Sequence, residues 1–247
     1  MLVFAHRGAS GYEPENTILA IEKALLTQVD AIEIDVHLAD GHLIVIHDRW
    51  LHKTTNGFGR ISDLSFEQIR KLDAGKGQKI PTLDEVLQTI HGQCLVNIEL
   101  KADRTVIPLL EVIDHAVQCY GFSYNQFLFS SFNHHLLFEI KSIRPEFQTG
   151  ALTASCPIDY AAFAQQLNAY SVHIDVDFVN YEFVKDAHQR GLKVYVYTVD
   201  GEEDIIELHR LGVDGIFSNF ITESLVKVAH LKQLPSELNP PIHPRLL

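Results

Sequence analysis

The sequence predicts an α/β fold, a (β/α)8 barrel of the TIM type with a small insertion after the second strand. Short apolar runs typical of strands alternate with helical patterns along the chain, and eight of these runs fit a barrel. Charged residues accompany the first of these runs, and barrels of this class gather their catalytic groups at the carboxyl ends of the strands. The 247 residues, 46% of them hydrophobic, suit a single barrel domain over residues 1–247.

The first two predicted strands carry the first polar side chains of interest. Apolar residues 2–5 are followed by His6 and Arg7, where the first strand stops. Residues 31–37 alternate with period two, so apolar side chains share one face and polar side chains share the other. The polar face carries Glu33, Asp35 and His37. Because the polar interior positions of a barrel cluster at its mouth, we expect these side chains to face the catalytic end.

Two further runs complete the polar cluster. Residues 43–47 end in His47, and we expect this run to pair back beside the second strand. Residues 96–101 alternate again and place Glu99 and Lys101 on one face. Three acids from two strands, two histidines and two cations would then face one another.

The alternation of strand and helix continues to the end of the barrel. The later strands are expected at residues 127–132, 149–152, 171–175, 193–198 and 213–217. The helix signals are a capping box from Thr82 to Glu85, a cap at Asn180 for the helix that ends at Gly191, and Gly212 at the close of the next helix.

Residues 48–81 interrupt the alternation of strand and helix. They contain a glycine-rich turn at 54–59, a short helix that opens with a capping box at Ser65, and a loop that closes at Pro81. An insertion on the carboxyl side of a barrel strand is expected to lie over the active-site mouth. Most of its apolar residues are expected to form a small core of its own. They are Trp50, Leu51, Phe58, Leu64 and Phe66.

Composition narrows the classes of partner and compartment. The formal net charge of −12, without a basic stripe, argues against nucleic acid and against an anionic membrane surface. Met1 leads directly into the first strand and no apolar run approaches membrane-spanning length, so we expect a cytoplasmic protein without a membrane anchor. The three cysteines lack zinc-type spacing and are expected to be buried free thiols. Residues 232–247 are rich in proline and are expected to form a C-terminal tail without chemistry.

Nine short blocks, in order, give the chain a family resemblance. They are His6-Arg7-Gly8, Glu15-Asn16-Thr17, Glu33-x-Asp35-Val36, His47-Asp48, Leu72-Asp73-Ala74-Gly75, Ile80-Pro81-Thr82-Leu83, Asn97-Ile98-Glu99-x-Lys101, Tyr197-Thr198-Val199 and Gly212-Val213-Asp214-Gly215-Ile216. This series resembles the signature of bacterial glycerophosphodiester phosphodiesterases of the cytosolic type, from about residue 3 to about residue 225. The resemblance implies a (β/α)8 barrel with this insertion. It also implies hydrolysis of a phosphodiester into glycerol 3-phosphate and an alcohol, a reaction of lipid and glycerol metabolism.

Glu33, Asp35 and Glu99 are the expected metal ligands. Their carboxylates come from adjacent strands and suit one hard divalent cation, Mg²⁺ or Ca²⁺. The resemblance places the family's metal at these positions. The alternative is that the three acids only form ion pairs with Arg7 and Lys101.

His6 and His47 are the expected catalytic residues, because the ordinary histidine pKa near about 6.5 lets one act as base and the other as acid. The resemblance assigns them these roles. It further implies that the substrate's own 2-hydroxyl attacks phosphorus first and gives a cyclic phosphate, an order of events that the sequence leaves open. Arg7 matches the family's phosphate-binding arginine, and Lys101 would add a second positive charge. For Arg7 the alternative is a structural ion pair with a barrel acid.

For several other side chains near these positions, the sequence leaves the role open. Asn16 either caps a helix or contacts substrate. His37 and His173 are left out of the catalytic set because packing behind the site is as good an account. Two aromatic residues belong either to the pocket wall or to the core, namely Phe132 and Tyr197. Asn219 stands where the family usually has Asp-x-Pro or Asn-x-Pro, and its role is left open.

The sequence therefore predicts metal-dependent hydrolysis of small glycerophosphodiesters, such as those that carry choline, ethanolamine or glycerol. A second enzyme hypothesis is a lysophospholipase D-type phosphodiesterase on the same scaffold, which needs an apolar slot for an acyl chain. A third hypothesis is a non-catalytic barrel that binds phosphorylated ligands. The head group, the native metal and assembly into a homo-oligomer are left open.

Overall fold

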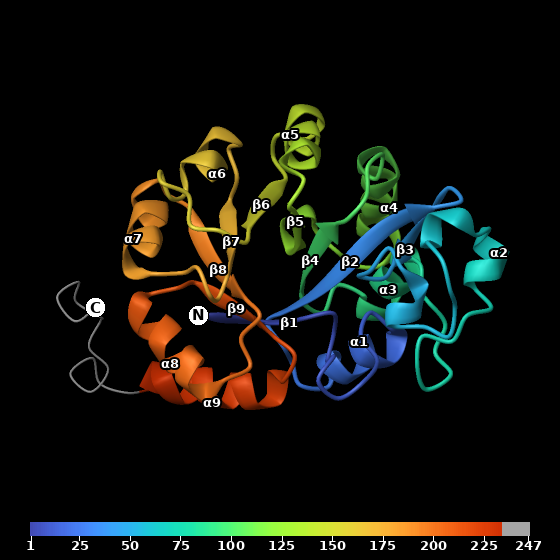
Figure 1. Ribbon diagram of the computed structural model, residues 1–247, viewed down its shortest axis with the longest axis horizontal. Helices are drawn as coiled ribbons and strands as arrows, with labels where there is room; N and C mark the ends of the chain where they lie inside the picture. The colour runs from blue at the N-terminus through green and yellow to red at the C-terminus, as the bar shows by residue number, and fades with distance from the viewer. Residues whose placement is uncertain (234–247) are drawn as a thin grey trace.

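The computed structural model describes residues 1–233, and its strands form a closed barrel ringed by helices (Figure 1). The parallel strands of the barrel are β1 (Leu2–Ala5), β2 (Ala31–Ala39), β4 (Leu95–Leu100), β5 (Phe127–Ser131), β6 (Gln148–Thr153), β7 (Ser171–Asp175), β8 (Lys193–Tyr197) and β9 (Gly215–Ser218). Strand β1 pairs with β9 on one side and with β2 on the other, which closes the barrel. The predicted (β/α)8 barrel is confirmed.

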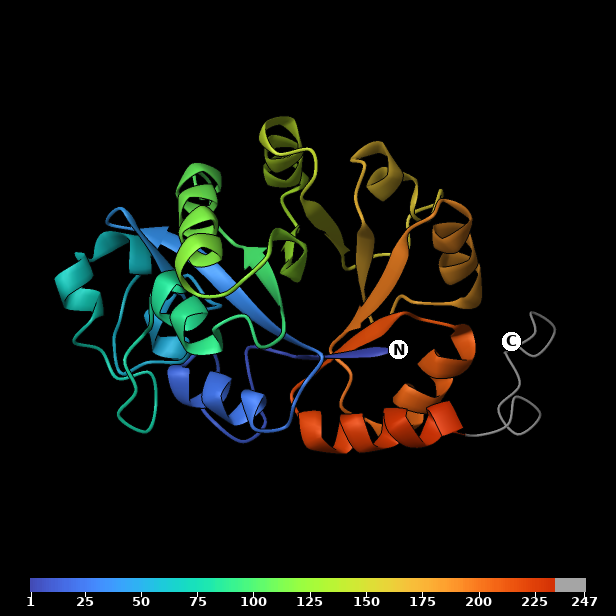
Figure 2. The ribbon, with the colours of Figure 1, turned by 180° about the vertical axis from the view of Figure 1, so that it is seen from behind.

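The helices lie outside the strands, as Figure 2 shows from the opposite side. They are α1 (Ile18–Leu25), α3 (Leu83–Ile90), α4 (Val106–Cys119), α5 (His134–Ile143), α6 (Ala162–Gln166), α7 (Tyr181–Gln189), α8 (Glu202–Leu211) and α9 (Ile221–Gln233). Three predicted helix signals are confirmed. Thr82 forms the capping box of α3, Asn180 caps α7, and Gly212 ends α8 in the left-handed conformation. Helix α7 ends two residues before the predicted Gly191.

Apolar side chains fill the space between strands and helices and also one level of the barrel interior. The interior level consists of Phe4, Ala31, Leu128, Tyr195 and Phe217. The ring centroid of Phe4 lies 4.9 Å from that of Tyr195 and 4.6 Å from that of Phe217. Buried Glu33, Asn97, Ser130 and His173 line a cavity together with Phe217. A layer of apolar side chains inside the barrel therefore lies next to the polar side chains that line the cavity.

One glycine makes room for a buried ring among these polar side chains. A Cβ at Gly150 would lie 2.2 Å from Nε2 of His173, which is fully buried. Any side chain at this position would displace the His173 ring. Gly150 is in register with Ser171 of the neighbouring strand β7, and the ring of His173 reaches back over the glycine.

Strand β2 is longer than the sequence predicts, because its second half has a different partner. From Ala31 to Val36 it pairs with β4, and from Val36 to Ala39 it pairs with the antiparallel strand β3 (His42–Val45). The predicted return of this run beside the second strand is confirmed. Glu33 and Asp35 lie within β2 and not at its carboxyl end, since β3 continues the ladder beyond the barrel.

The insertion over residues 48–81 contains two 3-10 turns and the short helix α2 (Phe66–Ile69). Ser65 forms the predicted capping box of α2. A separate apolar cluster includes Leu51 and Ile69, with Leu64 and Phe66 packed against it, so most of the predicted small core is present. Trp50 and Phe58 do not belong to it, and Phe58 is 83% exposed. Helix α2 lies at the outer edge of the molecule, beyond β3 (Figure 1).

The predicted tail over residues 232–247 falls mostly outside the described residues. Lys232 and Gln233 still belong to α9, and residues 234–247 lie outside the part of the chain that the structure describes. Among residues 1–233, no helix has the length and apolar character needed to cross a membrane.

Candidate active site

The turn after β1 presents His6 and Arg7 to the barrel interior. Arg7 and Gly8 both have positive φ angles, of 57° and 78°. This tight turn lets the Arg7 backbone N–H donate to Oε2 of Glu33 at 2.8 Å. A Cβ at Gly8 would lie 2.9 Å from the backbone of Ala20 in α1, so the close approach of the turn to this helix requires glycine.

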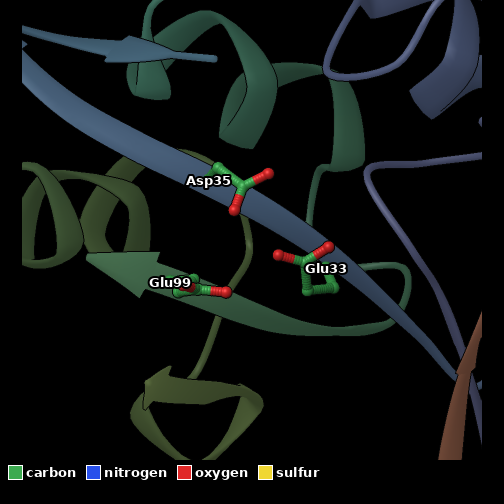
Figure 3. Close-up of side chains that lie close together, drawn as sticks. All are labelled: Glu33, Asp35 and Glu99. Carbon is green, nitrogen blue, oxygen red and sulfur yellow. The ribbon is translucent and has the colours of Figure 1, made fainter. Parts of the chain in front are cut away.

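The three predicted metal ligands converge at one point between β2 and β4. A carboxylate oxygen from each of Glu33, Asp35 and Glu99 lies within 4.8 Å of the other two, and all three residues are buried. Figure 3 shows the side chains of β2 and β4 turned toward one another. The arrangement follows from the register, because Asp35 is paired with Glu99 on the adjacent parallel strand. Side chains in register on parallel strands point to the same side.

This acidic cluster has a donor set that fits a hard divalent cation. Oε1 of Glu33 is buried without a hydrogen-bond partner, although buried polar atoms are nearly always partnered. Burial, and then the charges of Asp35 and Glu99, raise the pKa of Glu33 well above its ordinary value. Burial and the charge of Asp35 also raise the pKa of Glu99, to about 7, against the opposing effect of Lys101. A bound cation would supply the missing partner and favour the charged carboxylates.

Asp35 is the acid that the two cations already hold. Its carboxylate lies 3.1 Å from Nζ of Lys101 and 3.3 Å from Nε of Arg7. Burial would raise the pKa of Asp35, but Lys101 and Arg7 outweigh it and lower the pKa to about 2. The ion-pair alternative therefore describes part of the cluster. It gives no partner to Oε1 of Glu33, since neither cation forms a salt bridge with Glu33.

Asn16 supports the same carboxylate from the loop after β1. Its amide nitrogen donates to Oδ2 of Asp35 at 2.9 Å, and its amide oxygen accepts from the Asp35 backbone at 3.2 Å. Thr17, and not Asn16, caps helix α1. Of the two readings left open for Asn16, the structure excludes the cap. Asn16 instead fixes the position of Asp35.

His6 is fixed by the loop that follows β9. Its Nδ1 lies 2.8 Å from Oδ1 of Asn219. Burial and then the charge of Arg7 lower the pKa of His6 to about 4, against the opposing effects of Asn219 and Asp35. At neutral pH the imidazole is therefore uncharged and able to accept a proton.

His47 approaches from the segment that follows β3. Nε2 of His37 donates to its backbone carbonyl at 3.0 Å, so His37 acts as a support behind the site. Nδ1 of His47 is 3.5 Å from the Asp48 carboxylate. Burial is the largest influence and lowers the pKa of His47 below its ordinary value.

These groups line one cavity of about 400 Å³. From the predicted site it is lined by His6, Arg7, Glu33, His47, Glu99 and Lys101. Asp35, only 1% exposed, is not part of the lining. The opposite wall includes Phe132, Tyr197, Asp175 and Asp177, so the two aromatic residues belong to the pocket wall. No residue of 48–81 lines this cavity, and the position of the insertion over the mouth stays a prediction.

Two supporting residues of this site, Asp200 and Ser10, could not be predicted from the sequence. Asp200 follows β8 and its carboxylate accepts from Asn219 at 2.7 Å, while Ser10 donates to Asn219 at 2.7 Å. Asn97 donates to Ser130 at 3.0 Å on the cavity wall. Asn97 shares the inward face with Glu99, a signal the period-two pattern already contained. Asp200 and Ser10 carried no comparable signal.

Comparisons with known proteins agree with the geometry. The profile of the Glycerophosphoryl diester phosphodiesterase family matches residues 6–223. A glycerophosphodiester phosphodiesterase of Caldanaerobacter subterraneus subsp. tengcongensis is 39% identical over 228 residues, 88% of this chain and 93% of that protein. One of Bacillus subtilis is 33% identical over 245 residues, 89% of this chain and 84% of that protein.

Solved structures share the fold. An Oleispira antarctica phosphodiesterase in complex with the product sn-glycerol-3-phosphate has a TM-score of 0.85 and 29% identity, with 93% of this chain and 97% of that chain covered. A Thermotoga maritima glycerophosphodiester phosphodiesterase has a TM-score of 0.78 and 26% identity, with 92% and 98% covered. With the profile matching most of its length, the chain belongs to the glycerophosphoryl diester phosphodiesterase family.

Proposed function

We propose that this protein hydrolyses glycerophosphodiesters to glycerol 3-phosphate and an alcohol, with one divalent cation and with His6 and His47 as proton-transfer groups. The observation that carries the proposal is the cavity of about 400 Å³, which both histidines, two cations and two of the three acids line together. The product named for the Oleispira antarctica relative, sn-glycerol-3-phosphate, supports the same substrate class. A cavity of this volume is in the range of small-molecule sites.

Glu33, Asp35 and Glu99 would hold the cation, Mg²⁺ or Ca²⁺. Both ions prefer carboxylate oxygens, and the unpartnered Oε1 of Glu33 offers one of them. When bound, such an ion supplies Lewis-acid stabilisation of charge on phosphoryl oxygens. With Glu15 beside Arg7, four carboxylates face the two cations, and a divalent ion would offset the excess negative charge.

Arg7 and Lys101 would bind the phosphate. Arg7 has Nε toward Asp35 and Nη1 toward Glu15, so its guanidinium is held from two sides and lines the cavity in one orientation. Lys101 lies 3.1 Å from Asp35 and lines the same cavity. Fixed positive charges stabilise the charge that develops on phosphoryl oxygens without reorganising during the reaction.

His6 would act as the general base and His47 as the general acid. His6 takes the proton of the substrate's 2-hydroxyl as its oxygen bonds to phosphorus. His47 gives a proton to the oxygen of the leaving alcohol as the old bond breaks. Water then opens the resulting cyclic phosphate to give glycerol 3-phosphate. The low pKa of His6 keeps its imidazole neutral and ready for the first transfer.

Phosphorus NMR of glycerophosphocholine turnover tests this proposal. We expect formation of glycerol 3-phosphate with Mg²⁺ or Ca²⁺, its loss in excess chelator, and its return when the metal is restored. Titration of each metal into the stripped protein shows which of the two restores turnover. Binding of glycerol 3-phosphate without turnover under any metal would overturn the proposal in favour of a barrel that only binds phosphorylated ligands.

A further inference from the structure

Three successive loops of the barrel meet beside His6. They follow β8, β9 and β1, which are neighbours in the sheet order. The first loop contributes Asp200, the second Asn219, and the third His6 itself. This contact joins residues 213 positions apart, and it exists only because the barrel closes between β9 and β1.

Asp200 fixes which way the Asn219 amide faces. The carboxylate can only accept hydrogen bonds, and Nδ2 of Asn219 donates to its Oδ2 at 2.7 Å. The backbone N–H of Asn219 donates to the other oxygen, Oδ1, at 2.8 Å, and the Ser218 hydroxyl donates to the same atom at 3.0 Å. With its nitrogen held by Asp200, the amide must turn its oxygen toward His6.

The orientation of this oxygen decides the tautomer of His6. Oδ1 of Asn219 can only accept, so Nδ1 of His6 at 2.8 Å must donate and carry the proton. Oγ of Ser10 lies 2.7 Å from the same oxygen and 2.7 Å from the backbone carbonyl of His6, so its single O–H is shared between these two acceptors. The remaining ring nitrogen, Nε2, then carries the free lone pair that a general base needs.

We infer that Asn219 and Asp200 are positioning residues that hold His6 as the Nδ1-protonated tautomer, with Nε2 free to accept the proton of the attacking hydroxyl. The inference rests on the base role that the proposed function gives to His6. Neither residue touches the substrate in this account. Both act through the ring that they orient.

Asn219→Ala and Asp200→Asn test the two hydrogen bonds of this arrangement, from His6 to Asn219 and from Asn219 to Asp200. In Asn219→Ala the ring loses its acceptor, and we expect kcat for glycerophosphocholine to fall by about 10²-fold with KM nearly unchanged, since a wrong tautomer affects the proton transfer and not binding. In Asp200→Asn the fixed acceptor becomes an amide that can also donate, so the Asn219 amide is free to turn over. We expect a smaller fall in kcat there, because part of the population keeps the active tautomer.

Asn133→Ala is the matched control. Asn133 also follows a barrel strand, β5, and its amide also donates to an aspartate, Asp103, at 3.0 Å. It contacts no catalytic histidine in the hydrogen bonds of residues 1–233. We expect kcat of this variant to stay within a factor of about two of the wild type. A loss of kcat equal to that of Asn219→Ala would show a general effect on the loops and overturn the inference.

Nitrogen-15 NMR of the histidine rings reads the tautomer without any need for activity. We expect His6 of the wild type to be protonated on Nδ1, and the Asn219→Ala and Asp200→Asn proteins to show a mixture of tautomers. Wild-type His6 protonated on Nε2 would overturn the inference, and so would unchanged tautomers in both variants. If Asn219→Ala fails to fold, Asp200→Asn decides alone. If the wild type has the expected tautomer but no turnover, the proposed function is refuted, while the positioning role of Asn219 and Asp200 still holds.

Discussion

The first and second halves of the barrel have the same architecture but contribute differently to the cavity. Strands β1 to β4 and their loops provide all seven predicted site residues, from His6 to Lys101. Strands β5 to β9 and their loops provide a wall with aromatic rings, among them Phe132 and Tyr197, and the supporting Asn219. The buried acidic cluster and both cations thus belong to the first half, and the second half combines aromatic and polar groups with the two acids Asp175 and Asp177.

The two halves also compensate their buried polar groups by different means. In the first half Arg7 and Lys101 flank a cluster of buried acids, and one carboxylate oxygen has no partner. In the second half His173 is fully buried without a charged partner, and burial alone lowers its pKa. A metal is therefore expected to change the first half strongly and the second half little.

Glu33→Gln should give the largest effect and test this expectation directly. The substitution keeps the shape of the side chain but replaces the carboxylate, whose Oε1 has no partner, by an uncharged amide. The metal loses an anionic ligand, so we expect turnover to fall by about 10³-fold or more. The metal-free variant should unfold at a higher temperature than the metal-free wild type, because glutamine has no carboxylate that must be desolvated or protonated beside Asp35 and Glu99. Calorimetry should also show that added Mg²⁺ or Ca²⁺ no longer raises its Tm.

Asp175→Asn is the control from the other half. Asp175 lines the same cavity at the end of β7 and is not among the three clustered acids. We expect the metal-induced rise in Tm to persist in this variant. Full turnover of the wild type in excess chelator, with metal analysis finding none bound, would sink the metal hypothesis for the first half.

His6→Ala and His47→Ala come next in size. Each should lower kcat by about 10²–10⁴-fold while KM changes much less, since proton transfer acts in the transition state. Steady-state kinetics on glycerophosphocholine measures both parameters. His230→Ala is the control, because His230 is exposed on α9. We expect the kcat of this variant to equal that of the wild type. A variant of His6 or His47 with near-normal kcat would remove that residue from its assigned role.

His173→Phe probes the second half through the pH dependence of stability. In the unfolded chain His173 has its ordinary pKa of 6.5, and in the folded protein burial lowers the pKa to about 3. Between these values the unfolded state binds more protons than the folded state, so stability rises with pH across this window. The contribution is fully present above the unfolded pKa and is lost as the pH falls toward the folded pKa.

Urea unfolding measures this contribution as a difference between proteins. Phenylalanine keeps the ring between Tyr195 and Phe217 but cannot take a proton. From about pH 7 to about pH 5, the wild type should lose about 2 kcal/mol more of its free energy of unfolding than His173→Phe does. Equal losses in the two proteins would mean that His173 is protonated in the folded state and that the second half tolerates a buried charge.

The sequence predicted the features that depend on local pattern, and the acidic cluster of the first half is the main example. Alternation with period two on β2 and β4 places Glu33, Asp35 and Glu99 on one face, and the parallel register brings them together. Capping residues such as Thr82 act locally and were predicted for the same reason. These features depend on neighbours in the chain or on one pair of strands.

The remaining features depend on closure of the barrel and on packing between distant segments. The contact of His6 with Asn219 spans 213 positions and needs β1 to pair with β9. The extension of β2 beyond the barrel depends on β3, whose pairing decides where the strand ends. Phe58 was expected in the small core of the insertion, but that core is filled by Leu51, Ile61, Ile69 and their neighbours, which leaves Phe58 exposed. No local pattern encodes any of these three outcomes.

The smallest expected effect concerns the alcohol that the second half accommodates. The cavity of about 400 Å³ has charged or polar groups around most of its lining, and the apolar Trp50 and Phe58 of the insertion do not reach it. We therefore expect glycerophosphocholine to have a kcat/KM at least severalfold higher than that of lysophosphatidylcholine, measured below the micelle concentration, where lipid presentation cannot distort the comparison.

Phe58→Ala should leave both values unchanged, because this side chain is 83% exposed and lines no part of the cavity. Phe132→Ala removes an aromatic ring from the wall and should lower kcat/KM for glycerophosphocholine by a few-fold, in line with about 0.5–1 kcal/mol for contact of a cation with an aromatic face. A higher kcat/KM for lysophosphatidylcholine, lowered by Phe58→Ala, would show that the insertion closes over an acyl chain, and the lysophospholipase D hypothesis would replace the one proposed here.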